Sequence, residues 1–537
     1  MESLEEKFKK MHLLSREERI QLTQELRQLK PDFLKPYVPK WWWWRKCKTK
    51  VLIVCDGGLN FGTEGFDLSE FLTTFNALEA QSFVDYEVTL AHRGLITMSP
   101  NPVVVNHISN FNFATSVNLD DFDQIWLFAI SSFGGIGNDE VQAIEAYMNG
   151  GGGLFATGDH GSLGRAICDQ IPRVKDMRHW DNTPVGASND ANEVSMGGRR
   201  RNDTNKPRPG NSSADTFDHQ SDNVPQTIAV RTFGSGLPHP LLSIKKSLRP
   251  SGIIDIMPDH PHEGECSPET SFTVNGTSVK TQIIATSFVP GGNTSGGKDA
   301  TDPHCFPSIS VWDGRQANAG RIVIDSTWHH FVNINLNGED AAPGGLDSAD
   351  FEVIRQYYMN IATWMTRRKF ILCWRRWVLV DLLQNSQLVE ASLNHPTQKI
   401  EEIDLADLKS IGALAEEILS SKFSPSFARE LLIDFVSDFD DSMFQDLNIW
   451  KPDEKGSKKE HSYYENWINS DLVLHTAIGS GFIRLRDEVM KKQEDTDERF
   501  LDQADKLFVE GMKYGYSEAL ADLEREIKLF RKKYKRR

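Results

Sequence analysis

Short continuous apolar runs alternate with an amphipathic helical pattern in the first third of the chain. Residues 51–55 read VLIVC, residues 124–130 read QIWLFAI, and residues 154–157 read LFAT. Between the last two runs, acidic residues follow Asn138, and apolar residues then recur at helical spacing until Gly150. Continuous apolar runs are typical of parallel strands buried on both faces, and helices between them form the crossovers. The pattern predicts an α/β fold with a doubly wound, mostly parallel sheet.

The pattern changes further along the chain. After residue 347 the apolar positions follow helical spacing, and after about residue 385 no strand pattern returns. Additional strands are expected at residues 86–90, 253–257, 282–286, 308–312 and 321–325. Amphipathic helices are expected at residues 405–418, 472–490 and 501–530. The sequence therefore predicts an all-helical C-terminal module after the α/β domain.

These changes predict three regions. Residues 1–47 form an N-terminal helical arm and a tryptophan-rich linker, residues 48–368 form the α/β domain, and residues 369–537 form the helical module. Residues 172–226 are rich in Asn, Asp, Gly, Pro and Arg without periodicity, which predicts a long loop insertion. The WWWW run at residues 41–44 is expected to pack against the main domain, with a membrane-interface anchor or a partner surface as alternatives.

Charge and composition exclude several classes of protein. The chain has 537 residues and a formal net charge of -16, which argues against broad nucleic-acid binding because phosphates require many cationic partners. Its 6 cysteines form no C-x-x-C pair. The first thirty or so residues lack the apolar core of a signal peptide, and no apolar stretch reaches the roughly 20 residues of a membrane helix. We expect a soluble, cytoplasmic protein without membrane contact.

Histidines and carboxylates gather where two predicted strands end. The stretch GDHGSLG places Asp159 and His160 between glycines, as a sharp strand-to-helix turn with a reactive side chain requires. His329 and His330 follow the strand at residues 321–325. The carboxyl ends of parallel strands form the ligand-binding edge of a sheet, so both clusters can share one active site. We expect His160 to act as the acid–base residue or a metal ligand, oriented by Asp159.

Other residues near these strand ends are candidate ligand contacts. Asp56, Gly57 and Gly58 follow the first strand directly, which is typical of a loop that faces a ligand. Arg178 could recognise a phosphate or carboxylate group, or be a solvated loop charge. Trp328 precedes the histidine pair. All five are interpreted as candidate substrate-binding residues.

A separate loop carries candidate metal ligands. The stretch DHPHEGE contains His260, His262 and Glu263, and imidazole and carboxylate groups at short intervals can bind a divalent metal such as zinc. The same side chains can instead form hydrogen bonds within the loop. The metal site is therefore one of two interpretations of this stretch.

Three stretches of the chain resemble the class I glutamine amidotransferase-like superfamily, and within it the ThuA-like (trehalose-utilisation) branch. They are the opening strand VLIVC, the stretch NGGGGLFATGDHG and the late stretch GRIVIDSTWHHF. The resemblance runs from Val51 to about Met365. It implies a flavodoxin-like sheet and a sugar-related substrate, with His160 and either His329 or His330 where this branch carries histidine. It does not imply glutamine hydrolysis. In amidotransferases the strand-to-helix turn carries a cysteine nucleophile, whereas this chain has His160 there, and no glutamate follows the late histidines in the H-x-E pattern of the amidotransferase dyad.

These observations lead to two hypotheses. The preferred one is a hydrolase or lyase that acts on a small polar substrate, sugar-like or anionic, with or without the assistance of a metal. The alternative is a catalytically inactive ligand-sensing or scaffold protein that binds a partner through its helical module. In both, the C-terminal helices are expected to form a homo-oligomer.

Overall fold

The computed structural model describes residues 47–81, 84–159, 162–180, 225–233, 236–258, 264–289, 304–337, 346–392, 399–436, 470–491 and 498–534. The described residues fall into two compact units. Cys47–Ile371 form the first, which we call the α/β unit, and the second contains the described residues from Leu372 onward, which we call the helical unit.

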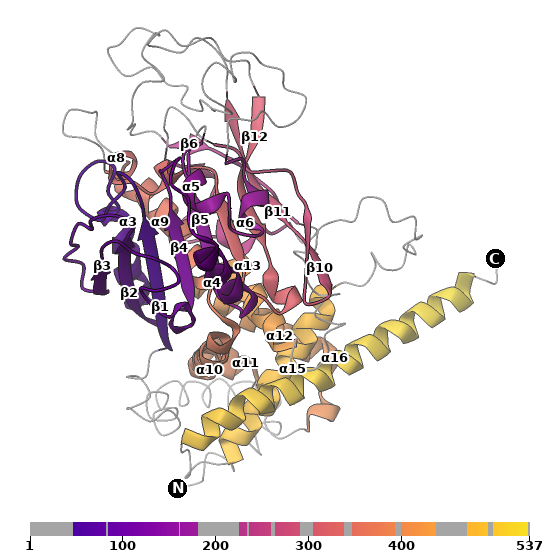
Figure 1. Cartoon of the computed structure of the whole chain (residues 1–537). Coiled ribbons are helices and arrows are strands. Elements are labelled where there is room, and N and C mark those ends of the chain that lie inside the picture. The colour runs from indigo at the N-terminus through magenta and orange to yellow at the C-terminus, as the bar shows by residue number, and fades with distance from the viewer. Residues whose placement is uncertain are drawn as a thin grey trace. The chain divides into compact units, whose positions relative to one another are not determined.

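The α/β unit is built on a nine-stranded sheet (Figure 1). In spatial order its strands are β3 (Val104–Ile108), β2 (Val84–His92), β1 (Cys47–Cys55), β4 (Gln124–Phe128), β5 (Gly153–Thr157), β13 (Ile322–Asp325), β12 (His304–Trp312), β11 (Gln282–Val289) and β7 (Ala229–Val230). The pairs from β3 to β13 are parallel, and the pairs from β13 to β7 are antiparallel. The expected α/β fold with a mostly parallel sheet is therefore present.

Helices cover both faces of the parallel strands because alternate side chains point to opposite faces. Ile125 and Leu127 of β4 belong to a core cluster with Ile144 and Met148 of α4 (Asn138–Asn149). Trp126 and Phe128 of the same strand belong to an aromatic cluster on the other face with residues of α3 (Ser69–Gln81) and α9 (Ser348–Trp364). The sheet is thus buried on both faces, as its continuous apolar runs predict.

Smaller elements complete the described part of the α/β unit. They are the two-stranded pairs β9 (Ser271–Val274) with β10 (Thr277–Lys280) and β6 (Gln226–Thr227) with β8 (Ile256–Met257), and the short helices α5 (Arg165–Cys168), α6 (Val174–Met177), η4 (Pro240–Leu242) and α8 (Asn333–Leu336). Among them, β6 and α8 contribute residues to the polar network that follows β13. Through these residues, β6 and α8 contact the segment that follows β13.

From Arg368 onward every described element is a helix. These helices are α10 (Arg368–Gln384), α11 (Ser386–Ser392), α12 (Leu405–Lys422), α13 (Pro425–Val436), α15 (Ser470–Lys491) and α16 (Glu498–Tyr534), with a 3-10 turn at Ile400–Glu402. In the helical unit, α15 packs against both α12 and α16. Among the residues that the structure describes, no helix is both long and apolar enough to span a bilayer.

Candidate functional site

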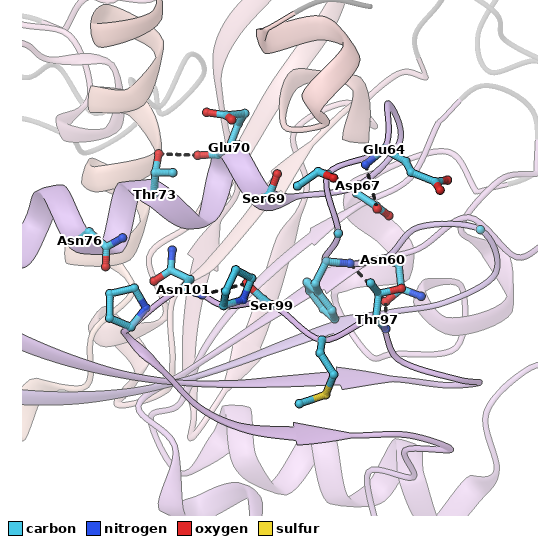
Figure 2. A pocket seen from close by; sticks show the side chains of 17 residues that line it. Asn60, Glu64, Asp67, Ser69, Glu70, Thr73, Asn76, Thr97, Ser99 and Asn101 are labelled. Carbon is cyan, nitrogen blue, oxygen red and sulfur yellow. Dashed lines mark hydrogen bonds between the residues drawn. The ribbon is translucent and has the colours of Figure 1, made fainter.

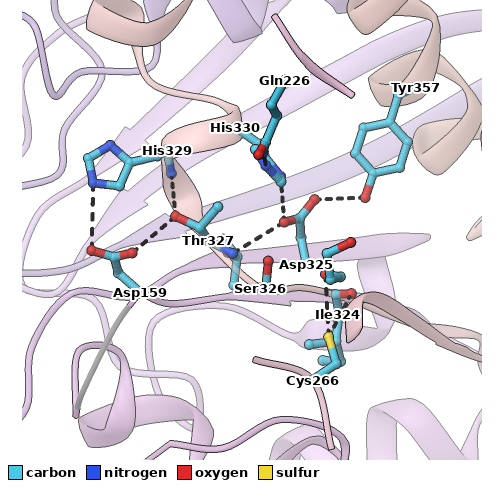
Figure 3. A network of polar contacts seen from close by, with 12 residues as sticks. Asp159, Gln226, Cys266, Ile324, Asp325, Ser326, Thr327, His329, His330 and Tyr357 are labelled. Carbon is cyan, nitrogen blue, oxygen red and sulfur yellow. Dashed lines mark hydrogen bonds and ion pairs between the residues drawn. The ribbon is translucent and has the colours of Figure 1, made fainter. Parts of the chain in front are cut away.

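The carboxyl ends of two neighbouring strands meet beside a network of buried polar side chains (Figure 3). Strands β5 and β13 are parallel neighbours, with Thr157 opposite Asp325. The chain beyond β13 turns into η6 (Trp328–His330), and the Trp328 N–H donates to the Gly158 carbonyl at 2.7 Å. This hydrogen bond holds the segment after β13 against the segment after β5. It is the local reason that residues far apart in sequence share one site.

Asp159 and His329 face each other in this network. The Asp159 Oδ1 atom accepts a hydrogen bond from the Thr327 hydroxyl at 3.1 Å, and Asp159 Oδ2 lies 3.6 Å from His329 Nε2. Thr327 Oγ1 also accepts from the His329 N–H at 3.1 Å. Both the carboxylate and the imidazole are about 1% exposed. We call these two side chains the Asp159–His329 pair.

Asn335 and two aromatic rings fix the orientation of His329. Its Nδ1 atom lies 2.9 Å from the Asn335 Oδ1 atom, which can only accept, so Nδ1 carries a proton in this arrangement. The Trp328 ring stacks on the imidazole at a centroid distance of 4.0 Å, and Phe66 meets it edge-on at 6.0 Å. In the neutral imidazole, the unprotonated Nε2 atom therefore faces the Asp159 carboxylate.

His330 lies next in the chain but makes a different set of contacts. Its Nδ1 atom donates to Asp325 Oδ1 at 2.8 Å, and its Nε2 atom lies 3.1 Å from Gln226 Nε2. Asp325 Oδ2 accepts from the Tyr357 hydroxyl at 2.8 Å, and burial with the neighbouring Asp325 charge raises the pKa of Tyr357. His330 is fully buried, and both ring nitrogens have partners. Two hydrogen bonds of normal length are typical of a structural histidine. His329 is equally buried but differs at Nε2, which lies 3.6 Å from the Asp159 carboxylate, a separation longer than a hydrogen bond.

Arg178 is buried between the segments that follow β5 and β13 and donates to the backbone of both. Its guanidinium donates to the backbone carbonyls of Asp159, Ser326 and His179, and it lies 4.5 Å from the centre of the Trp180 ring. Burial lowers the pKa of Arg178. In this position the side chain holds the two strand ends together, and about 1% of it is exposed.

The loop after β1 contributes a buried carboxylate at the same edge of the sheet. Asp56 Oδ1 accepts from the backbone N–H groups of Ile130 and Ser131, at 2.6 and 3.0 Å. Burial raises the pKa of Asp56, although these N–H donors and the nearby His92 act in the opposite direction. Gly57 and Gly58 follow and are exposed. Asp56 thus ties the ends of β1 and β4 together.

The chain matches no protein-family model, no curated protein and no solved structure. Of the predicted site residues, Asp159, Trp328, His329 and His330 lie together after β5 and β13, whereas Asp56, Gly57 and Gly58 follow β1. Arg178 donates a hydrogen bond to the Asp159 carbonyl of the first group.

Several predicted residues lie outside the part of the chain that the structure describes. They are His160, His260, His262, Glu263, the tryptophan run at residues 41–44 and most of the expected insertion at residues 172–226. Among the described residues, no group of three or more His, Cys, Asp or Glu side chains is arranged to hold a metal ion. The predicted metal ligands therefore stay a prediction.

Four residues of the network had no role in the sequence analysis. They are Gln226, Thr327, Asn335 and Tyr357. Thr327 had a usable signal, because it lies between Asp325 and His329 in the stretch that follows β13. Gln226, Asn335 and Tyr357 come from β6, α8 and α9, and no local pattern connects them to a histidine.

Proposed function

We propose that the α/β unit is a hydrolase or lyase that acts on a small polar substrate at the carboxyl ends of β5 and β13. We further propose a flavodoxin-like fold and membership of the ThuA-like branch of the class I glutamine amidotransferase-like superfamily. The strand order supports the first of these: without the edge strand β3, the parallel strands run β2-β1-β4-β5-β13, which is the flavodoxin order 2-1-3-4-5.

The Asp159–His329 pair is the observation that carries the proposal. Because Nδ1 donates to Asn335, a proton taken up by His329 binds at Nε2, where the imidazolium forms an ion pair with Asp159. A histidine held in one orientation beside a carboxylate is suited to general acid–base catalysis. His160 follows Asp159 in the chain, and we propose that it contacts the substrate. In this mechanism the pair accepts a proton from the reacting group and returns it to the leaving group.

Substitutions of the pair test this function. We expect His160→Ala, Asp159→Asn and His329→Gln each to lower turnover by about 100-fold or more, since general acid–base catalysis typically contributes that much. Turnover is measured on a substrate found by screening esters, amides and glycosides with the full chain. His239→Asn serves as the control, because His239 is a buried histidine whose described contacts lie outside the network. Full activity in His329→Gln, with unchanged melting temperature, would contradict the mechanism.

A metal-assisted form of the same reaction uses the same pair. A metal-binding histidine commonly donates its other ring N–H to a fixed acceptor, as His329 does to Asn335. Asp159 and His329 would then be two ligands, and His160, His260, His262 and Glu263 are candidates for the others. A bound zinc ion would lower the pKa of a coordinated water. Elemental analysis of protein purified without chelators decides between the two forms, because full activity in metal-free protein rules out the metal.

The alternative function is a ligand-sensing or scaffold protein that assembles through its helical unit. Its support is α16, a helix of 37 residues in which Leu529 is 67% exposed. We propose that these C-terminal helices form a homo-oligomer and that the protein is cytoplasmic. Light scattering of the full chain and of a Leu529→Glu variant tests the assembly. Catalytic turnover in the substrate screen would favour the enzyme, with the helices as its assembly arm.

A further inference from the structure

Two cavities of the α/β unit have linings of opposite charge. The first, of about 680 Å³, has the carboxylates of Glu64, Asp67 and Glu70 in its lining (Figure 2). None of the described residues around it is a lysine, arginine or histidine. The second, of about 250 Å³, is lined by residues 150–151, 315, 318–321 and 366–369. We call the second one the basic cavity, because the charged side chains in its described lining are all cations.

The basic cavity lies at the amino ends of β5 and β13, the strands whose carboxyl ends lead to the Asp159–His329 pair. Gly150 and Gly151 connect α4 to β5, and residues 318–321 lead into β13. Strand β5 has 5 residues, so its two ends are about 16 Å apart. The basic cavity is therefore separate from the proposed catalytic site.

Five cationic side chains line the basic cavity, and none of its described lining residues is an aspartate or a glutamate. The five are Arg315, Arg321, Arg367, Arg368 and Lys369. The whole chain has a formal net charge of -16, so this cluster is opposite in sign to the chain as a whole. Like charges close together repel one another, and an anion bound among them relieves that repulsion.

Two of these cations build the wall of the cavity. Arg321 is 5% exposed, and its guanidinium donates to Asp313 Oδ1 at 2.8 Å and to the Trp364 carbonyl at 3.0 Å. Arg315 donates to the Thr366 carbonyl at 2.6 Å. These hydrogen bonds hold the segment before β13 against the end of α9 and the residues that follow it. The cavity therefore has a wall that is fixed before any ligand binds.

The other three cations lie at the start of α10. Arg368 and Lys369 are its first two residues, and both are exposed. Arg367 precedes them and donates to the carboxylate of Asp120 at 3.1 Å. Lys369 lies 3.2 Å from Asp123, but its side chain is 66% exposed, and such exposed ion pairs are weak enough to be exchanged for a ligand. The amino end of this 17-residue helix adds partial positive charge beside the side chains.

We propose that the basic cavity binds a phosphate group, either as inorganic phosphate or as part of a small phosphate monoester. This site is additional to the proposed catalytic site and does not depend on it. A phosphate group carries a charge of about −1.5 to −2 at pH 7, so it gains more from several cations than a carboxylate of single charge does. Four of the five cations are arginines, whose planar guanidinium donates paired hydrogen bonds to phosphate oxygens. The cavity is also smaller than the roughly 300 Å³ at which pockets for drug-sized ligands begin, which suits a small anion.

Calorimetric titration of the full chain, in a low-salt buffer without phosphate, tests the proposal. We expect inorganic phosphate or glycerol 3-phosphate to bind saturably, and acetate to bind at least tenfold more weakly than the tighter of the two. Tighter binding of inorganic phosphate identifies free phosphate as the ligand, and tighter binding of glycerol 3-phosphate identifies a monoester. Absence of binding by both phosphates, or equal binding of acetate, overturns the proposal.

A doubly substituted protein locates the ligand in this cavity. Arg368→Gln with Lys369→Gln removes two exposed cations from the lining and should weaken phosphate binding at least tenfold without unfolding the chain, which circular dichroism verifies. The matched control is Lys48→Gln with Arg165→Gln, which removes two exposed cations of the α/β unit outside the lining and should leave binding unchanged. Unchanged binding in the first protein, or an equal loss in both, overturns the proposal.

A third variant separates this site from the proposed function. That function includes anionic substrates, so the Asp159–His329 pair is the competing place for phosphate. His329→Gln should bind phosphate as tightly as the unaltered protein, because His329 does not line the basic cavity. Loss of phosphate binding in His329→Gln would place the ligand at the catalytic site and overturn the proposal. Phosphate binding by a chain without turnover in the substrate screen would remove the proposed enzyme and leave the basic cavity as a phosphate site.

Discussion

Asp159 and Asp325 both follow or end central strands, yet their surroundings give them different roles. Asp325 accepts hydrogen bonds from His330 Nδ1, the Tyr357 hydroxyl and the Thr327 N–H. These are fixed protein donors around a fully buried carboxylate, which is typical of a structural group. Asp159 accepts a hydrogen bond from the Thr327 hydroxyl, but its other carboxylate oxygen lies 3.6 Å from a histidine nitrogen, a separation longer than a hydrogen bond. This contrast is the reason that the proposed mechanism uses Asp159 and leaves Asp325 a structural role.

Substituting Asp325 should therefore cost stability. Asp325→Asn replaces an acceptor with an amide that cannot satisfy all three donors, and breaking such a buried charged network typically costs about 3 kcal/mol. Tyr357→Phe removes a single hydrogen bond and should cost about 1 kcal/mol. Urea unfolding followed by tryptophan fluorescence measures both changes. A loss in Asp325→Asn no larger than that in Tyr357→Phe would show that the network is not structural.

His239 should make folding stability depend on pH. Its burial, with the Arg321 charge nearby, lowers its pKa to about 3, whereas an unfolded histidine has a pKa of about 6.5. Between these values the unfolded chain binds a proton that the folded chain does not, so stability falls as the pH falls. The free energy of unfolding should fall by about 1.4 kcal/mol for each unit that the pH drops between about 6 and the folded pKa of about 3. Above pH 6.5 or so both states are deprotonated, and the stabilisation is fully present.

The matched variant for this pH dependence is His239→Asn. Asparagine does not titrate, and its side-chain oxygen can replace Nδ1 as the acceptor of the Leu241 N–H at the start of η4. The difference in unfolding free energy between the two proteins, measured in urea from pH 7 to pH 4, should therefore change with pH. Parallel curves for the two proteins would contradict the burial of a neutral His239.

At the scale of elements, strands with continuous apolar runs could be predicted because burial on both faces leaves a plain signal. Strands β1, β4, β5 and β13 all contain predicted segments. Strand β3 escaped prediction because its residues are half-buried or exposed, so VVNHI has no apolar periodicity. The direction of a strand could not be predicted either. Both β12 and β13 are apolar, as parallel strands usually are, yet they pair antiparallel. Pairing direction depends on partners distant in sequence.

Two further elements had signals that the sequence analysis did not use. Helix α3 carries Phe71, Leu72, Phe75 and Leu78 at helical spacing, and all four are buried. The β9–β10 hairpin turns at Asn275–Gly276, and Asn-Gly between short strands is the strongest local signal for a tight hairpin. Both residues have positive φ angles, 51° and 80°, as that turn requires. Local pattern was therefore sufficient for these elements.

The helical unit depends on a close approach between α12 and α15. A Cβ atom added at Gly479 of α15 would lie 1.8 Å from the Leu408 carbonyl oxygen of α12. Gly479→Ala should therefore separate the helices and cost about 2 kcal/mol, a typical value for an overpacked core. Thermal unfolding followed by circular dichroism measures the loss. Ser421→Ala, on the exposed part of α12, is the control, and an equal effect in both variants would contradict this packing.

At the scale of the whole molecule, the described residues form two compact units. We expect calorimetry to resolve two unfolding transitions, because each unit buries its own apolar residues. Asp325→Asn should lower the temperature of one transition, and Gly479→Ala that of the other. A single transition that both substitutions shift equally would show that the units unfold as one.

From the sequence, the candidate site could be predicted only for residues that directly follow strands. Asp159 and His329 come together because their strands are adjacent, and the strand-end rule anticipates this from sequence. The rule does not say which of two consecutive histidines faces Asp159. That choice follows from Asn335 and Gln226, which lie on separate elements and bind one imidazole each. Their positions depend on tertiary packing and have no local signature.

The hydrogen bond between Gln226 and His330 has a consequence for how this protein can diversify. Gln226 and His330 are 104 positions apart in the sequence. Arg178 likewise donates to the carbonyls of Asp159 and Ser326, which follow different strands. A substitution at position 226 or 178 can therefore disturb the histidine segment from a distant part of the sequence, so variation that alters this site need not occur at the histidines themselves.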